Sequence, residues 1–230
     1  DEFFKTVQEN GYDKTFAVLM KTAFSALYLT ADVETAAVEL RKLKRKAALL
    51  IAMADLSGAW NLNKITESLS VLAEASLRIA VSALLREAAA KGDWTVSNPE
   101  NPEEDSGLVI LAMGKLGARE LNYSSDIDLI VLYDAETAPY TGKRDIGAFF
   151  VKLTRALVAM MEEQTPQGYV FRTDLRLRPD PGSTPIALSA EAAACYYESF
   201  AQNWERAAFI KARPVAGDKR SGMAFLKEIA

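Results

Sequence analysis

Histidine is absent from this sequence of 230 residues, and there is a single cysteine, Cys195. Without histidine the chain can form no Ser-His-Asp triad, no Cys-His pair and no histidine metal site. One cysteine can form neither an intrachain disulfide nor a thiolate zinc site. The chemistry of this chain must therefore come from carboxylates, Lys and Arg, hydroxyls and backbone amides, a set of groups that suits hard cations such as Mg²⁺.

Excess positive charge is missing as well. The 27 Lys and Arg residues face 31 Asp and Glu residues, for a net charge of -4, so there is no general basic field for nucleic acid. We find no apolar run near the ~18 residues that span a bilayer, and the first residues do not resemble a signal peptide. We expect no nucleic-acid partner, no membrane segment and a cytoplasmic location. The missing initiator Met and the helix-like end at 223–230 indicate a piece of a longer protein.

The first part of the chain is predicted to be helical. Half of all residues are hydrophobic, enough for a core that removes about 70–75% of the unfolded surface from water. Residues 1–92 are expected to be helical almost throughout: apolar residues recur at helical spacing from Phe16 to Tyr28, a second helix begins near Asp32, and a third helix carries Ile65 and ends near Gly92. The basic run 41–46 is expected to be a solvated helix face, because acidic residues precede it and no aromatic residue interrupts it.

The pattern changes after a segment that is rich in proline and acidic residues. Residues 97–107 predict a linker or long surface loop, so we expect a helical domain at 1–105 and a second domain at 106–230. The second domain is predicted to be a small mixed sheet with helices, which makes the whole chain α+β. Its expected strands are Leu108–Met113, Asp126–Tyr133 and Tyr169–Leu177, and its expected helices run from Asp145 to about Gln164 and from Ser189 to about Ile210.

Three aspartates are the candidate catalytic residues and metal ligands. Asp126 and Asp128 enter a strand two residues apart, so their side chains share one face and repel each other unless a cation lies between them. Taken alone, such a pair is more often a strand entry or a helix cap. Gly114-Lys115 after the preceding strand, together with Ser125, favours a nucleotide site, because glycine lets backbone amides approach phosphates.

The third predicted strand adds a third carboxylate and three guanidinium groups. By alternation, Asp174 shares a face with three arginines, an arrangement that suits a site for metal and phosphate together. The candidate nucleotide- and phosphate-binding residues are then Gly114, Lys115, Ser125, Arg172, Arg176 and Arg178. Asp134 and Asp180 are rivals of Asp174, and their loop settings favour capping roles.

These residues carry a resemblance to known families. A strand, a glycine turn, Asp126-Ile127-Asp128 and a later carboxylate resemble the polymerase-β-like nucleotidyltransferases. The full run from Ala112 to Leu129 resembles the signature of the glutamine synthetase adenylyltransferase family. The blocks Asp174-Leu175-Arg176-Leu177-Arg178-Pro179, Trp204-Glu205-Arg206 and Lys211-Ala212-Arg213 are similar to that family too.

The resemblance implies a function. Members of this family carry two nucleotidyltransferase units: one attaches AMP to a tyrosine of glutamine synthetase, and the other removes it by phosphorolysis and releases ADP. The wording of the motif favours the removing unit, with the ATP-dependent adenylylating unit as the alternative. A regulatory or scaffolding module without catalysis is the alternative of another class. The resemblance further implies two Mg²⁺ ions, ADP or ATP and phosphate as substrates or products, a PII-type signal protein as partner, and a unit that continues past residue 230.

Overall fold

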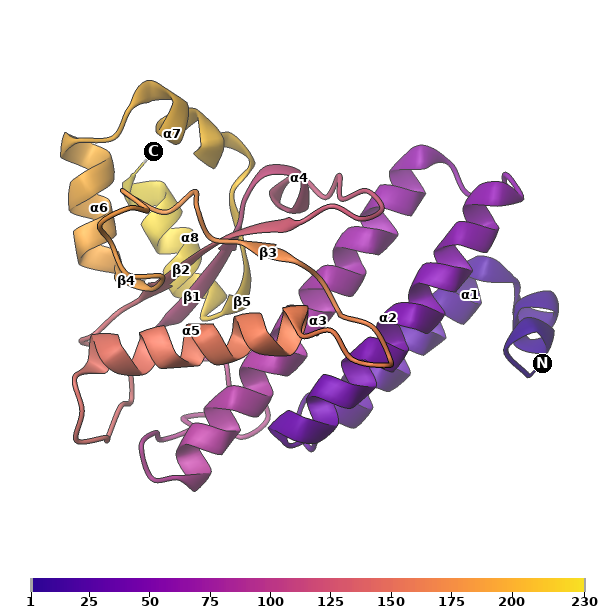
Figure 1. Ribbon diagram of the computed structural model, residues 1–230, viewed down its shortest axis with the longest axis horizontal. Coiled ribbons are helices and arrows are strands. Elements are labelled where there is room, and N and C mark those ends of the chain that lie inside the picture. Colours follow the sequence, from indigo (N-terminus) through magenta and orange to yellow (C-terminus); the bar gives the residue numbers. More distant parts are fainter. Residues whose placement is uncertain (1, 230) are drawn as a thin grey trace.

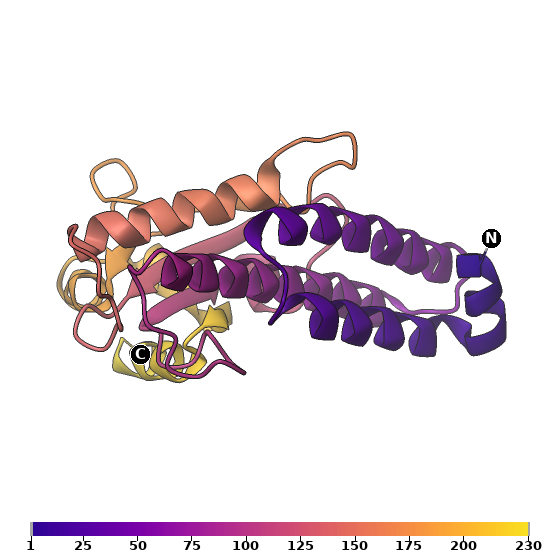
Figure 2. The same cartoon turned by 90° about the horizontal axis from the view of Figure 1, so that it is seen from below.

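Three long helices form the first part of the chain. The computed structural model describes residues 2–229, and its helical part extends away from the sheet (Figures 1 and 2). Asp32 accepts a hydrogen bond from the Thr35 amide and Asn61 accepts one from the Lys64 amide, so the second and third helices begin at side-chain caps, the second where the sequence predicted. Gly11, with a φ of 72°, kinks the first helix. The three helices are α1 (Glu2–Leu27), α2 (Val33–Leu56) and α3 (Leu62–Ala90).

The third helix corrects an expectation about apolar runs. On length and composition alone α3 could cross a membrane, because an 18-residue window of it has a mean hydropathy of 1.5. Within the fold, 78% of that window is buried. α3 packs against α2, α5 and β5, so burial in the protein core accounts for its hydropathy.

The second part of the chain forms a small mixed sheet, as the sequence predicted, with five strands where three were expected. The order along the sheet is β3-β2-β1-β5, and β4 also pairs with β2. β1 is antiparallel to both β2 and β5, whereas β2 is parallel to β3 and β4. The strands are β1 (Leu108–Ala112), β2 (Ile127–Tyr133), β3 (Thr173–Asp174), β4 (Leu188–Ser189) and β5 (Arg213–Gly217).

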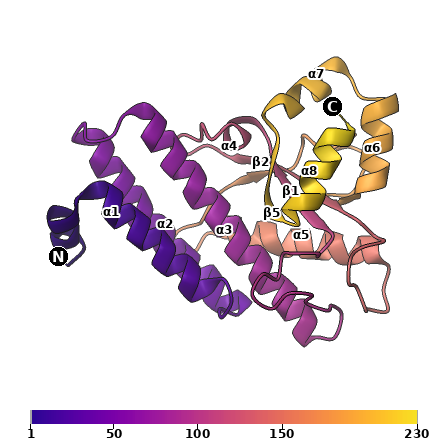
Figure 3. The same ribbon diagram turned by 180° about the vertical axis from the view of Figure 1, so that it is seen from behind.

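Helices cover both faces of this sheet. Leu108, Ile110 and Ala112 of β1 join the large core made with α2, α3 and α5. Val109 and Leu111 belong to a smaller core on the other face, made with α6 and α8. Figure 3 shows α6 and α8 beside the sheet. Burial of both faces explains why β1 is a continuous apolar run. The helices of this part are α4 (Gly114–Gly117), α5 (Ile146–Glu162), α6 (Ala190–Ser199), α7 (Asn203–Ala208), the 3-10 helix η1 (Phe209–Lys211) and α8 (Lys219–Glu228).

Two elements are shorter than predicted, and two strands, β4 and β5, were not predicted. The third strand is only Thr173–Asp174, because the Asp174 carboxylate accepts a hydrogen bond from the Arg176 amide and bends the chain there. The helix expected at 189–210 keeps its Ser189 cap but breaks after Ser199, where Gln202 and Glu205 form a new capping box. β5 carries a proline, which edge strands tolerate.

The loop between the two parts is fixed in place rather than fully solvated. Glu103 is 2% exposed and accepts hydrogen bonds from the Tyr28 hydroxyl, Arg78 Nε and the Gly217 amide at 2.7–2.8 Å. These donors belong to the helical part and to the sheet. The apolar core also continues across the predicted boundary near residue 105, so the two-domain division stays a prediction.

The basic run 41–46 is only partly the solvated face that was expected. Arg41 is 2% exposed, and its guanidinium donates to the Glu163 and Gly168 carbonyl oxygens. The Lys44 ammonium lies 3.5 Å from the centre of the Phe171 ring, and burial lowers the pKa of Lys44 to about 8. The run therefore anchors the segment that leads into β3.

Candidate functional site

A glycine turn after β1 forms one side of the candidate site. Gly114 has a φ of 51°, a conformation that glycine adopts without strain. A Cβ atom at this position would lie 2.8 Å from Asp128 Oδ2. Both observations explain the glycine: the turn and the Asp128 carboxylate are in direct contact only because no side chain separates them.

The pairing of β2 with β3 places two of the predicted aspartates side by side. Asp128 lies opposite Asp174 in the parallel register, so the two side chains share a face. Burial, followed by the negative charges of Asp174 and Asp126, raises the pKa of Asp128, and Arg176 and Lys115 oppose that shift. The structure thus brings all three predicted carboxylates within electrostatic reach of one another.

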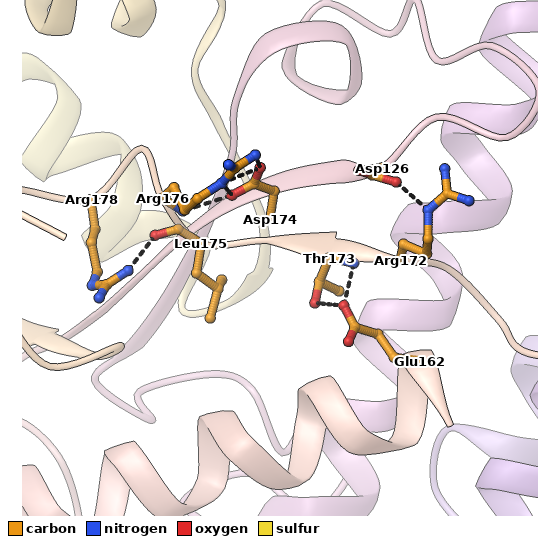
Figure 4. A network of polar contacts seen from close by, with 8 residues as sticks. All are labelled: Asp126, Glu162, Arg172, Thr173, Asp174, Leu175, Arg176 and Arg178. Carbon is orange, nitrogen blue, oxygen red and sulfur yellow. Dashed lines mark hydrogen bonds and ion pairs between the residues drawn. The ribbon is translucent and has the colours of Figure 1, made fainter. Parts of the chain in front are cut away.

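Two of the three carboxylates are paired with arginines (Figure 4). Arg172 donates through Nε to Asp126 and through Nη2 to the Ser124 carbonyl oxygen. Arg176 Nε lies 2.9 Å from Asp174 Oδ2, and hydrogen bonds from Arg176 lower the pKa of Asp174. Both guanidinium groups are exposed, so each can leave its carboxylate at small energetic cost.

Arg178 does not lie with these residues as predicted. The chain turns after Asp174, and the Arg178 guanidinium donates to the carbonyl oxygens of Leu175, Pro181, Thr184 and Pro185 at 2.7–3.2 Å. The strand alternation that was expected to align it with Asp174 ends before it (Figure 4). In this structure Arg178 stabilises the loop before β4.

The other two predicted nucleotide-binding side chains share a partner in the turn. Lys115 Nζ donates to Asn122 Oδ1 at 3.3 Å, and the Ser125 hydroxyl donates to the same oxygen. Ser124, which precedes Ser125 in the turn, has a φ of 55°. Lys115 is exposed and close enough to act on the charge of Asp128, so the turn and the aspartates form one cluster.

Two residues that help to build the site escaped the sequence analysis or were only noted there. Glu162, the last residue of α5, accepts from the Thr173 amide at 2.7 Å and from the Thr173 hydroxyl at 2.6 Å (Figure 4). Arg213 of β5 donates to the Gly117 carbonyl oxygen at 2.9 Å and pairs with Glu74 of α3. The family-like block Lys211-Ala212-Arg213 could have indicated Arg213, whereas nothing in the sequence indicates Glu162.

The donor chemistry of the cluster fits Mg²⁺, but arginines bind two of its three carboxylates. Carboxylate oxygens are the ligands that Mg²⁺ prefers. Burial and then the charges of Asp174 and Asp126 raise the pKa of Asp128, and a nearby cation would oppose both effects. Across residues 2–229, no group of three or more His, Cys, Asp or Glu side chains is arranged to hold a metal ion. For all three carboxylates to bind one metal ion, Arg172 has to release Asp126 and Arg176 has to release Asp174.

Comparison with known proteins gives one consistent result. The profile of the family described as glutamate-ammonia ligase adenylyltransferase matches residues 5–228. The chain is 56% identical over 191 residues, 83% of its length, to a protein of Bartonella quintana, and 47% identical over 218 residues, 95% of its length, to one of Bradyrhizobium diazoefficiens. A protein of Mesorhizobium japonicum is 51% identical over 200 residues, 87% of the chain.

All three relatives are named bifunctional glutamine synthetase adenylyltransferase/adenylyl-removing enzyme. The chain spans about a fifth of the length of each of them (20%, 22% and 20%). The family match covers nearly the whole chain, and the motif at 112–129 lies in the turn and strand that form the candidate site. The chain therefore belongs to the glutamate-ammonia ligase adenylyltransferase family.

Proposed function

We propose that this chain is a Mg²⁺-dependent nucleotidyl-transfer unit that removes AMP from an adenylylated tyrosine of glutamine synthetase. Phosphate is the acceptor and ADP the product. The observation that carries the proposal is the register of β2 and β3, which puts Asp128 beside Asp174 and next to the glycine turn. The mixed sheet and its helices are then a polymerase-β-like nucleotidyltransferase domain. The names of the relatives, which include both adenylyl transfer and adenylyl removal, support the proposal.

The reaction makes one phosphorus–oxygen bond and breaks another. A phosphate oxygen attacks the phosphorus of the tyrosyl AMP, the bond from phosphorus to the tyrosine oxygen breaks, and the phenolate takes up a proton, which leaves tyrosine and ADP. Charge on the phosphoryl oxygens would be neutralised by Mg²⁺, two ions in our proposal. Asp126, Asp128 and Asp174 would hold the metal.

The neighbouring polar groups have a second role in this proposal. Once Asp126 and Asp174 hold metal, Arg172 and Arg176 are free to bind phosphate oxygens, since guanidinium groups pair with phosphate as they do with carboxylate. Gly114, Lys115 and Ser125 bind the nucleotide at the turn. Arg178, which was a candidate on sequence grounds, is left out because four backbone carbonyl oxygens of its own loop bind it.

The choice of AMP removal over AMP addition rests on the residues of the motif from Gly114 to Asp128. AMP addition from ATP uses the same chemistry in the other unit of the family and remains the second candidate. We further propose that the full-length protein acts in the cytoplasm and answers to a PII-type signal protein.

The test substitutes the aspartates and measures both directions. Asp126→Asn and Asp128→Asn are made in this chain and at the matching positions of the Bartonella quintana relative, with Asp134→Asn at the far end of β2 as the matched control. The Asp134 carboxylate accepts from the Glu136 amide at 2.9 Å and lies outside the site. Release of ADP from adenylylated glutamine synthetase, with phosphate and Mg²⁺, should fall about 100-fold or more in the two site variants and stay unchanged in the control.

Three other results would change the conclusion. Full phosphate-dependent activity in both site variants contradicts the assignment of the aspartates. Incorporation of AMP from ATP into unmodified glutamine synthetase, without ADP release from the modified protein, identifies the adenylylating unit. If this chain and the Bartonella quintana relative are both folded but bind neither Mg²⁺ nor nucleotide, a regulatory or scaffolding module is favoured.

A further inference from the structure

A cavity separate from the aspartates lies between α3 and α5. Its volume is about 670 Å³, which falls within the range of small-molecule sites. The C-terminal end of α3, residues 139–145 and the first half of α5 surround it, and Figure 1 shows α5 crossing α3 below the sheet. The aspartates, Gly114 and Arg176 are not among its lining residues. Ala148 of the cavity and Glu162, which binds β3, lie on the same helix, α5. The helix between these two residues is about 20 Å long.

The charge of this cavity is opposite to that of the chain. Five cationic and two anionic side chains line it, a net charge of +3 in a chain of net charge -4. Lys91 is paired with Glu87 at 2.8 Å. In the described part of the chain, the other four cations form no ion pair or side-chain hydrogen bond; they are Lys143, Arg144, Lys152 and Arg155. Unpaired cations around a concavity attract anions and raise their local concentration.

The floor of the cavity is apolar and its walls are fixed. Phe149 and Leu153 of α5 line it, and the Phe149 ring stacks on Trp94 at 5.3 Å between centroids. Hydrogen bonds fasten the loop wall to the end of α3: the Thr141 amide donates to the Asp93 carbonyl oxygen at 3.1 Å, and the Thr95 amide to that of Pro139 at 3.0 Å. A preformed site loses less entropy when a ligand binds.

We propose that this cavity binds an organic polyanion, a small molecule with two or more phosphate or carboxylate groups and an apolar part. The anionic groups bind Lys143, Arg144, Lys152 and Arg155, with the guanidinium groups able to form paired hydrogen bonds to either kind of anion. The apolar part lies against Phe149 and Leu153. A concavity of this volume favours a small molecule over a protein surface. The site is distinct from the nucleotide position proposed at the glycine turn.

The test measures binding of four probes to the whole chain in metal-free buffer at low salt. ADP, ATP, citrate and pyrophosphate are titrated by calorimetry and by tryptophan fluorescence, because Trp94 stacks on a residue of the cavity wall. Lys152→Gln/Arg155→Gln removes two cations from α5. Lys14→Gln/Arg45→Gln is the matched control, since it makes the same charge change at exposed helix positions outside the cavity. Ala156→Gln fills the cavity without a change of charge.

We expect saturable binding of ADP, ATP or citrate to one site. The α5 double variant and Ala156→Gln should each weaken that binding about tenfold or more, and the control should not. Comparing the affinities of ADP and ATP with that of citrate shows whether the cavity prefers organic phosphates or carboxylates. Pyrophosphate that binds as tightly as ADP would contradict a role for the apolar floor.

Two results overturn the proposal. The first is that no probe binds at millimolar concentration, or that every variant binds the probes as tightly as the unsubstituted chain does. Circular dichroism shows that the variants compared are folded. The second is an oligoglutamate peptide that binds more tightly than any of the probes, which would indicate an acidic protein partner. Neither result bears on the AMP-removal proposal, whose test substitutes Asp126 and Asp128.

Discussion

Asp128 shows most clearly that the candidate site lowers the stability of the folded protein. It is half-buried beside two other carboxylates, and these surroundings raise its pKa above the usual value of 3.8. At pH 7 its ionised form is therefore less stable in the folded protein than in the unfolded chain. Such local instability is common at functional sites, because the arrangement that binds a cation is unfavourable without one.

This imbalance leads to a prediction about stability. Asp128→Asn removes a buried negative charge, so we expect the metal-free variant to gain about 0.5–2 kcal/mol of unfolding free energy at pH 7. Because the folded pKa is raised, the original protein loses this stability as pH rises from 3.8 through the folded pKa. The difference between variant and original should therefore shrink as pH falls toward 3.8. Urea unfolding at several pH values measures it. Asp134→Asn, which weakens the turn directly after β2, should give no gain in unfolding free energy at any pH.

Single residues also show what the sequence could indicate and what it could not. Asp126, Asp128 and Asp174 were predicted from strand spacing and family resemblance, and the structure brings them together. Arg178 was grouped with them by strand alternation, which holds only while the strand continues. Its real partners are backbone carbonyl oxygens of a loop, and such acceptors leave no pattern in the side-chain sequence.

Among the elements, β3 and β4 are the shortest, with two residues each, and β3 carries one of the three candidate metal ligands. Two residues of strand give little stability of their own, and the contacts that fix β3 come from outside it. Glu162 at the end of α5 binds Thr173 through two hydrogen bonds, and the Ile127 amide of β2 donates to the Arg172 carbonyl oxygen at 2.9 Å. The position of Asp174 thus depends on where α5 ends.

We expect Glu162→Ala to loosen β3 without unfolding the protein. Loss of the hydrogen bonds to Thr173 should speed hydrogen exchange at the amides of Thr173 and Ile127 about tenfold, because each bond contributes about 1 kcal/mol. Glu162→Gln keeps an acceptor oxygen and should restore most of the protection. Glu163→Ala is the matched control, since that carboxylate binds Arg41 instead. Equal exchange in the Ala variant and the original would show that other contacts hold β3.

The long elements were predicted well for a physical reason. α2, α3 and α5 bury one face over many turns, and β1 and β2 bury both faces, so the spacing of their apolar residues repeats often enough to be read. Short elements lack that repetition. β5 contains Pro214 and Gly217, which argue against a strand, yet pairing with β1 along one edge gives it a place in the sheet.

At the scale of the whole molecule, the helical part and the sheet share a core. α3 packs against α2 on one side and against α5 and β5 on the other. The proline-rich sequence between α3 and β1 indicated a solvated linker, because local composition cannot show what a distant residue contributes. Tyr28, Arg78 and Gly217 make it an internal contact through Glu103.

Glu103 therefore provides a test of whether the two parts fold as one. Glu103→Leu leaves the Tyr28 hydroxyl, the Arg78 guanidinium and the Gly217 amide without their shared acceptor, so we expect a loss of about 3–5 kcal/mol of unfolding free energy. The neighbouring Glu104→Leu is the matched control, because its more exposed carboxylate pairs with Arg220 at 3.7 Å and should cost under about 1 kcal/mol. Urea unfolding followed by far-ultraviolet circular dichroism and by tryptophan fluorescence should give one coincident transition in the original and in both variants. Separate transitions for the two signals would mean that the helical part and the sheet unfold independently, as the two-domain prediction from the sequence would have it.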